Sequence, residues 1–205
     1  MKITFIGAGS TVFARNVIGD CMCVDSLKDS TFALYDIDGE RIEESRVILE
    51  SMRKVKGGFG KIECYVGTEQ RKAALKDADF VVNAIQVGGY DPCTIIDFEI
   101  PKKYGLRQTI ADTLGIGGIM RALRTIPVME DFARDMEDVC PDALLLNYTN
   151  PMGILTGYMQ HHTPVKTIGL CHSVQVCSKS LLESLGMEDK LDGVRDLIAG
   201  INHMA

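Results

Sequence analysis

The first twenty residues place an apolar strand pattern directly before a glycine turn and a helical pattern. Lys2–Ile6 is a short apolar run, and Gly7 and Gly9 follow it at once. Residues 12–20 then carry apolar side chains at helical spacing. In this setting Gly7 permits a tight turn, and Gly9 lets the backbone approach a pyrophosphate at the helix N-terminus. This order of strand, turn and helix is typical of a parallel α/β sheet.

The end of the second predicted strand, residues 31–35, indicates what the turn would bind. Asp36 follows it directly, where a carboxylate can accept hydrogen bonds from the ribose hydroxyls of an adenosine. The same charge repels a 2′-phosphate, so NAD is favoured over NADP. Val12 replaces the third glycine of the usual fingerprint, and a tight turn that binds no dinucleotide stays open as the alternative. The residues expected at NAD are Gly7, Gly9, Ser10, Thr11, Asp36 and Gln86.

Apolar runs and helical patterns alternate along the rest of the chain. They predict further strands at 61–66, 80–85, 144–146 and 167–170, and helices at 40–54, 120–139 and near 151–161. Pro127 should kink the long helix or divide it in two. The alternation predicts an α/β fold with a doubly wound parallel, Rossmann-like sheet. Residues 1–195 would form an NAD-binding domain, and residues 196–205 would begin a second, substrate and metal domain.

Polar or glycine-rich segments follow three of these strands. They are residues 83–89, 147–151 and 171–173. Because α/β sheets bind ligands beyond the carboxyl ends of their strands, we expect the three segments to meet in one cleft. A glycine-rich loop at 108–118 could close over the nicotinamide end of the cofactor. Asn150 precedes Pro151 and could donate hydrogen bonds to a ligand, although Asn-Pro also forms helix-entry turns.

Cys171, His172 and His203 carry side chains that can bind a divalent metal. A thiolate and an imidazole suit manganese, iron, cobalt or zinc. Cys171 and His203 are too far apart in sequence for a zinc finger, but they could form an open site that substrate oxygens complete. A buried cysteine and a helix-capping histidine are the alternative reading of the same residues.

Composition excludes several other classes of protein. The net charge of −6 argues against a nucleic-acid footprint, and no stretch approaches 18 consecutive apolar residues, which a membrane span needs. The seven cysteines are odd in number and lack the spacing of a disulfide framework. The sequence therefore predicts a cytoplasmic protein that binds small molecules, without nucleic-acid or membrane partners.

Six segments of the chain resemble the NAD- and manganese-dependent family 4 glycoside hydrolases, and most closely the α-galactosidases among them. In chain order they read GAGSTVF, IQVGGYDPCT, QTIADTLGIGGIMRALRTIP, LNYTNPM, GLCHSVQ and GINHMA. The resemblance implies a glycosidase that lies outside the usual two-carboxylate mechanism. In that family NAD oxidises the carbon-3 hydroxyl of the sugar, a base removes the proton on carbon 2, and the aglycone leaves from carbon 1. Water then adds, and the ketone is reduced again.

The resemblance also implies roles for individual residues. Cys171 and His203 would bind Mn²⁺ or another divalent metal, and Asn150 would bind the substrate. His172 would protonate the leaving oxygen, at a position where some relatives carry aspartate. Relatives that act on 6-phosphorylated glycosides have an arginine around residues 93–96, whereas this chain has Cys-Thr-Ile-Ile. An unphosphorylated hexoside is therefore the expected substrate.

Family members are roughly twice as long as this chain. The resemblance implies that the sequence beyond Ala205 supplies the catalytic tyrosine, much of the sugar pocket and the interface of a homo-oligomer. A chain of residues 1–205 is then expected to bind cofactor without turnover. Two other functions stay open: an NAD-dependent dehydrogenase of the malate or lactate type, and a non-catalytic NAD-binding module. Net production of NADH would identify the dehydrogenase.

Overall fold

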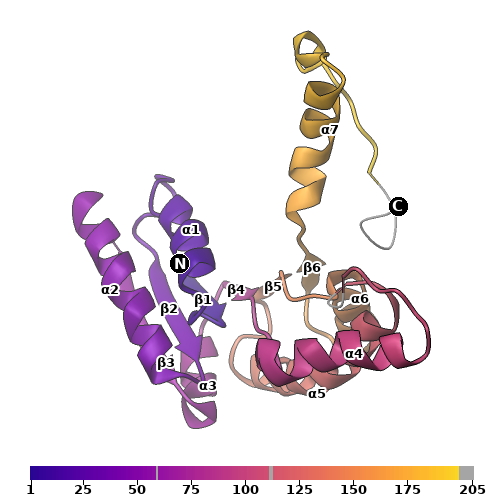
Figure 1. Ribbon diagram of the computed structural model, residues 1–205. Coiled ribbons are helices and arrows are strands. Elements are labelled where there is room, and N and C mark those ends of the chain that lie inside the picture. Colours follow the sequence, from indigo (N-terminus) through magenta and orange to yellow (C-terminus); the bar gives the residue numbers. More distant parts are fainter. Residues whose placement is uncertain (59, 111–112, 199–205) are drawn as a thin grey trace.

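Six parallel strands form one sheet in the computed structural model, which describes residues 1–58, 60–110 and 113–198 (Figure 1). Their spatial order is β3-β2-β1-β4-β5-β6. Because the order reverses between β1 and β4, this is the doubly wound arrangement of dinucleotide-binding folds, and the predicted fold class is confirmed. The strands are β1 (Lys2–Ile6), β2 (Thr31–Asp36), β3 (Lys61–Val66), β4 (Phe80–Asn83), β5 (Leu144–Asn147) and β6 (Thr167–Gly169).

Helices cover both faces of this sheet. Helices α1 (Thr11–Cys21) and α2 (Gly39–Val55) pack on one face, and α3 (Arg71–Leu75), α5 (Gly115–Val139) and α6 (Met152–His162) pack on the other. The two cores follow from the strand period of two, since alternate side chains of β1 enter different cores. Phe5 lies in the core under α1 and α2, and its neighbour Ile6 lies in the core under α3, α5 and α6.

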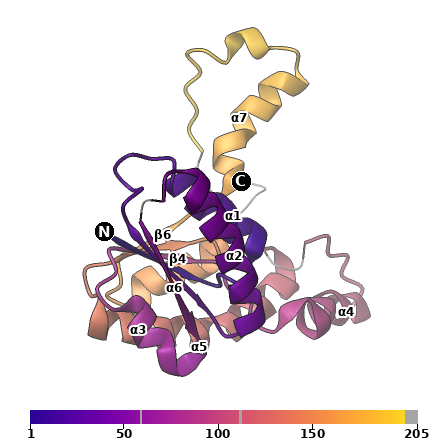
Figure 2. The ribbon, with the colours of Figure 1, turned by 90° about the vertical axis from the view of Figure 1, so that its left-hand side faces the viewer.

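Two further helices lie outside this two-sided arrangement. Helix α4 (Ile95–Lys103) packs against α5, after a single turn, η2, at Gly89–Thr94. Helix α7 (His172–Ser184) follows β6 and projects away from the sheet (Figures 1 and 2). The sequence patterns did not predict α4 or α7. None of the helices within the described ranges is both long and apolar enough to cross a membrane.

Pro127 was predicted to kink the long helix or to divide it in two. The division is wrong, because α5 is one continuous helix from Gly115 to Val139. A proline removes the hydrogen bond to the carbonyl four residues earlier. That residue is Leu123, which is 65% exposed, so water can reach this side of the helix. Helix α5 also begins five residues before the predicted start, and it includes residues 115–118, the last part of the segment expected to be a glycine-rich loop.

The glycines at the start of α5 allow close packing. A Cβ at Gly117 would lie 2.7 Å from the backbone oxygen of Asp97, and a Cβ at Gly118 would lie 2.9 Å from the backbone of Thr113. These contacts are too short for any side chain. The two glycines therefore bring the first turn of α5 against α4 and against the loop before it.

Strand register brings the polar strand ends to one edge of the sheet. Ile6 pairs with Asn83, and Asn83 pairs with Asn147. Asn147 in turn pairs with Gly169 at the end of β6. The segments that follow β1, β4, β5 and β6 consequently leave the sheet side by side, as expected for parallel strands. The proposed domain boundary at residue 195 stays a prediction.

Candidate active site

A cleft of about 790 Å³ opens at this edge of the sheet. Its walls come from the segments after β1, β4, β5 and β6 and from helices α5, α6 and α7. Of the residues singled out in the sequence, the cleft is lined by Ser10, Gln86, Asn150, Cys171 and His172. The predicted meeting of the three polar segments thus holds in the structure. Gly7, Gly9, Thr11 and Asp36 lie at the glycine turn and are not part of the lining.

The glycine turn after β1 is held against both neighbouring strands, β2 and β4. Gly7 has φ of +85°, and a Cβ there would lie 2.7 Å from the backbone oxygen of Ala84, just after β4. On the other side, the backbone N–H groups of Gly7 and Ala8 both donate to the carbonyl of Tyr35, at 2.9 and 3.1 Å. The turn can therefore be built only with glycine at position 7.

Asp36 binds the backbone of this turn. Its Oδ2 accepts a hydrogen bond of 2.7 Å from the N–H of Gly9, and its Oδ1 accepts one of 3.1 Å from the N–H of Asp38. A Cβ at Gly9 would lie 2.7 Å from that same Oδ2. The sequence placed Asp36 at the end of β2 correctly, but it did not predict the bond between the carboxylate and the turn.

The N-terminus of α1 is suited to an anion. Ser10 is the N-cap residue, and it makes no side-chain capping bond in the described structure. The first turn of the helix carries no acidic residue. Backbone N–H groups at a helix N-terminus, together with the helix dipole, favour negative charge. This end of α1 meets the cleft at Ser10.

Three rings meet where α1 and α7 approach the cleft. Phe13 lies edge-on to Tyr148, with ring centroids 4.8 Å apart. His172 lies 6.0 Å from Phe13 and 5.9 Å from Tyr148, measured between centroids. Burial raises the pKa of the Tyr148 hydroxyl above its ordinary value. The rings place the exposed imidazole of His172, the first residue of α7, at the mouth of the cleft.

Asn150 lies in a helix-entry turn and also at the cleft, whereas its predicted role in binding a ligand stays a prediction. Its side-chain Oδ1 accepts a bond of 3.4 Å from the N–H of Met152, at the start of α6, so it lies in a helix-entry turn. The peptide bond to Pro151 is cis. Asn150 also lines the cleft. Its backbone carbonyl accepts a bond of 3.1 Å from Nε of Arg121 on α5.

The predicted metal ligands are only partly described. Cys171 is half-buried, precedes α7 and lines the cleft. His203 lies outside the described residues. Within the described ranges, no three His, Cys, Asp or Glu side chains gather as a metal site would require. The metal site therefore stays a prediction that rests on Cys171 alone among the residues with known positions.

Sequence reasoning missed a buried asparagine pair under the cleft. Nδ2 of Asn83 donates 3.0 Å to Oδ1 of Asn147, and both residues are fully buried. Oδ1 of Asn147 also accepts a bond of 3.1 Å from the N–H of Thr149. These bonds tie the ends of β4 and β5 to the loop that carries Asn150. The available signal was that both strands end in asparagine at paired positions.

Comparison with known proteins identifies the family. A family model described as family 4 glycosyl hydrolase matches residues 2–187. An α-galactosidase of Bacillus subtilis is 62% identical over 204 residues, which are 100% of this chain and 46% of that protein. An α-galacturonidase of the same organism is 34% identical over 99% of this chain and 45% of its own length. The chain thus spans about half the length of the curated relatives it matches.

A solved structure gives the same result. The 6-phospho-β-glucosidase from Thermotoga maritima, determined with manganese, NAD⁺ and glucose-6-phosphate, superposes with a TM-score of 0.73 at 28% identity. The match covers 91% of this chain and 43% of that one. The fold of this chain is therefore also that of a solved 6-phospho-β-glucosidase, and the chain belongs to family 4 of the glycosyl hydrolases.

Proposed function

We propose that this chain carries the cofactor-binding part of an NAD- and metal-dependent glycosidase that cleaves unphosphorylated α-galactosides. The observation that carries the proposal is the 62% identity to an α-galactosidase across the whole chain. The other relatives named above are less than 40% identical and differ in the sugar they act on. The cleft at the carboxyl ends of β4, β5 and β6 supplies the place for the reaction.

The residues of the turn fit NAD. A Cβ at Gly7 or Gly9 would fill space against the neighbouring backbone or the carboxylate of Asp36, and the N-terminus of α1 carries no acidic residue in its first turn. The residues proposed to hold the cofactor are Gly7, Gly9, Ser10, Thr11, Asp36 and Gln86. When bound, NAD supplies a reversible hydride acceptor for oxidation of the sugar at carbon 3.

Asp36 can bind the adenosine ribose without a large rearrangement. A carboxylate has about four lone-pair sites, and among the described residues its oxygens accept one bond from Gly9 and one from Asp38. It can therefore keep its hold on the turn and accept from ribose hydroxyls at the same time. The negative charge disfavours a 2′-phosphate, which supports the choice of NAD over NADP.

A divalent metal fits the cleft through Cys171. The half-buried thiol lines the cleft in the segment after β6, and a deprotonated thiolate can be one ligand of a first-row divalent metal whose other ligands include oxygen atoms. His203 is proposed as the second ligand from the sequence alone. When bound, the metal supplies Lewis-acid polarisation of the sugar oxygens.

Asn150 and His172 are the cleft side chains proposed to act on the substrate. Asn150 sits at the cleft in a turn held by Arg121 and by the start of α6, which supports a role for its side-chain amide in binding a sugar hydroxyl. His172 stands at the mouth of the cleft, and an imidazole can donate a proton to a leaving oxygen near neutral pH. Phe13 and Tyr148 limit the motion of that ring.

Residues 93–96 support a substrate without a phosphate group. They read Cys-Thr-Ile-Ile and contribute no positive charge at the end of η2 and the start of α4. All seven cysteines lie within the described residues and none is in a disulfide bond, as suits the reducing cytoplasm proposed for this protein.

Assembly into a homo-oligomer and the lack of nucleic-acid partners stay predictions from the sequence. Membership of family 4 favours the glycosidase over a malate- or lactate-type dehydrogenase or a non-catalytic module.

A panel of nitrophenyl glycosides tests the proposal. Residues 1–205 are joined to the C-terminal part of the Bacillus subtilis α-galactosidase, and hydrolysis of α-galactoside, α-glucoside, α-galacturonide and 6-phospho-galactoside is measured. We expect turnover of the α-galactoside, with a need for NAD, manganese and thiol reductant. His172→Asn should abolish it, whereas His161→Asn, an exposed histidine on α6, should not. Preferred hydrolysis of the 6-phosphate or the galacturonide would contradict the proposed substrate.

A further inference from the structure

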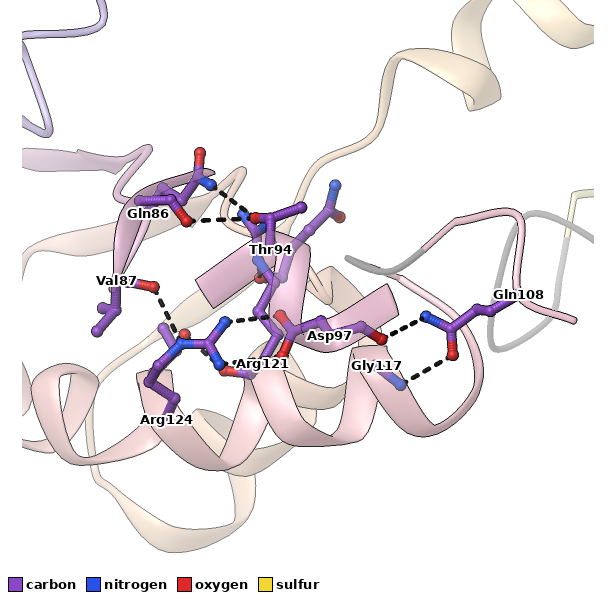
Figure 3. A network of polar contacts seen from close by, with 11 residues as sticks. Gln86, Val87, Thr94, Asp97, Gln108, Gly117, Arg121 and Arg124 are labelled. Carbon is purple, nitrogen blue, oxygen red and sulfur yellow. Dashed lines mark hydrogen bonds and ion pairs between the residues drawn. The ribbon is translucent and has the colours of Figure 1, made fainter. Parts of the chain in front are cut away.

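Two arginines on helix α5 each bind a backbone carbonyl of a different cleft segment. Nε of Arg121 donates 3.1 Å to the carbonyl of Asn150 in the segment after β5. One turn later, Nε of Arg124 donates 3.1 Å to the carbonyl of Val87 in the segment after β4 (Figure 3). Helix α5 therefore connects two walls of the cleft, and Arg124 does so through backbone that follows Gln86.

A buried carboxylate fixes Arg124 in this position. Nη1 and Nη2 of Arg124 donate to the two carboxylate oxygens of Asp97 at 3.2 and 2.8 Å, so the pair is bidentate. Asp97 is 1% exposed. Such a pair has a defined geometry because both donors and both acceptors are planar. The pair therefore holds the guanidinium of Arg124 in the orientation in which it binds the carbonyl of Val87.

The surrounding backbone is built around this pair. Gly88 has φ of +87°, and a Cβ there would lie against Cys93 and 3.2 Å from Nε of Arg124. The backbone carbonyl of Asp97 accepts from Nε2 of Gln108, whose Oε1 accepts 2.9 Å from the N–H of Gly117. The segment after β4, the start of α4 and the start of α5 are thus joined into one unit (Figure 3).

Gln86 belongs to the same unit. Its Nε2 donates 3.2 Å to Oγ1 of Thr94, which in turn donates 3.3 Å to the carbonyl of Gly89. Gln86 lines the cleft, whereas Asp97 and Arg124 do not. The orientation of the Gln86 side chain is therefore set by groups that cannot themselves touch a ligand in the cleft.

The position of Gln86, just after β4, indicates which half of a dinucleotide it would contact. In a doubly wound sheet the dinucleotide lies across the point where the strand order reverses. Asp36, at the end of β2, would serve the adenosine half. The segment after β4 lies on the opposite side of the reversal, and it would serve the nicotinamide half.

We propose that Asp97 and Arg124 are positioning residues that hold the Gln86 segment in the arrangement required by the nicotinamide half of NAD. This inference rests on the proposed function, because it assumes that the chain binds NAD. It predicts that loosening the pair weakens binding of the whole dinucleotide without affecting the adenosine half. A general structural role would weaken both.

The test compares binding of NAD with binding of ADP by calorimetry. Asp97→Asn keeps the shape of the side chain and leaves no buried carboxylate, but it ends the bidentate pair. If the Gln86 segment then spends about a tenth of the time in the competent arrangement, NAD affinity falls about tenfold, while ADP affinity is unchanged. Thr94→Val removes the bond from Gln86 and the bond to the carbonyl of Gly89 but leaves the Asp97–Arg124 pair intact, and we expect NAD affinity to fall about threefold. Arg134→Ala, an exposed arginine on the same helix, is the matched control and should change neither.

The outcomes distinguish failure of the positioning role from failure of the proposed NAD binding. Unchanged NAD affinity in Asp97→Asn, or an equal loss for NAD and ADP, would overturn the positioning role. If circular dichroism shows that Asp97→Asn does not fold, Thr94→Val decides alone, and unchanged NAD binding there overturns the inference. Failure of the unmutated chain to bind NAD would instead remove the proposed cofactor, and the inference with it.

Discussion

Replacing Gly7 by alanine is the most direct way to test how the glycine turn is built. The residue has φ of +85°, and the new methyl carbon would lie 2.7 Å from the backbone oxygen of Ala84 and 2.8 Å from its carbonyl carbon. Neither the glycine turn nor the segment after β4 can easily move to relieve this contact, because hydrogen bonds hold both. The N–H of Ala84 donates 2.9 Å to the carbonyl of Ile6, and the N–H of Gly7 donates 2.9 Å to the carbonyl of Tyr35.

Two contributions set the magnitude of the effect. A side chain at left-handed φ costs about 1–2 kcal/mol, and a methyl group forced into packed surroundings costs about 1–3 kcal/mol. We therefore expect Gly7→Ala to lower the free energy of unfolding by about 2–5 kcal/mol. NAD binding should fall as well, because the turn moves away from β4.

Two other glycines separate these contributions. Gly105 has φ of +73° and no described atom within 4 Å of an added Cβ, so Gly105→Ala should cost only the backbone part, about 1–2 kcal/mol. Gly157 is inside α6 with equally open space, so Gly157→Ala should stabilise by about 0.5–1 kcal/mol. Urea unfolding followed by far-UV circular dichroism measures all three. A cost for Gly7→Ala within about 0.5 kcal/mol of that for Gly105→Ala would refute the close contact with β4.

Three further predictions concern the cofactor, a buried thiol and the metal. Asp36→Ala should weaken NAD binding and narrow the preference over NADP, measured by titration; equal binding of the two dinucleotides by the unmutated chain would remove the argument. Burial raises the pKa of Cys140 to about 11, so at pH 8 iodoacetamide should label the exposed Cys23 and Cys177 well before Cys140. Labelling of Cys140 should become faster as the pH rises. Mass spectrometry of the labelled peptides measures the order, and labelling of Cys140 first would contradict the prediction. Cys171→Ser should lower manganese affinity at least about tenfold by electron paramagnetic resonance, whereas Cys177→Ser should not; equal affinity in both variants would count against the ligand role.

The first half of the sheet could be predicted closely from local sequence. The bounds of β1 and β3 agree with the predicted ones, and β2 extends by one residue, to Asp36. Buried parallel strands appear as short apolar runs, and here glycine or aspartate residues end them. Helix α4 gave no comparable signal. It is short, contains Pro101 and follows a turn that contains Pro92, so its stability comes from packing on α5 and from the Asp97–Arg124 pair.

Local sequence likewise predicted only part of the candidate site. The meeting of Gln86, Asn150 and Cys171 in one cleft follows from strand order, because carboxyl ends of parallel strands share an edge. The contacts of Arg121 and Arg124 join residues that are 27 to 37 positions apart. No local pattern encodes which partner a charged side chain will find at that separation. His203 lies outside the described residues, and its role stays a prediction.

We propose that this chain serves a glycosidase that uses NAD without consuming it. The decisive measurement follows nitrophenol release and absorbance at 340 nm together, with α-galactoside as substrate and the chain joined to the C-terminal part of its Bacillus subtilis relative. We predict that release depends on added NAD and manganese while no NADH accumulates over many turnovers. Release at the same rate after NAD is removed completely, or NADH formed in proportion to product, would contradict the account.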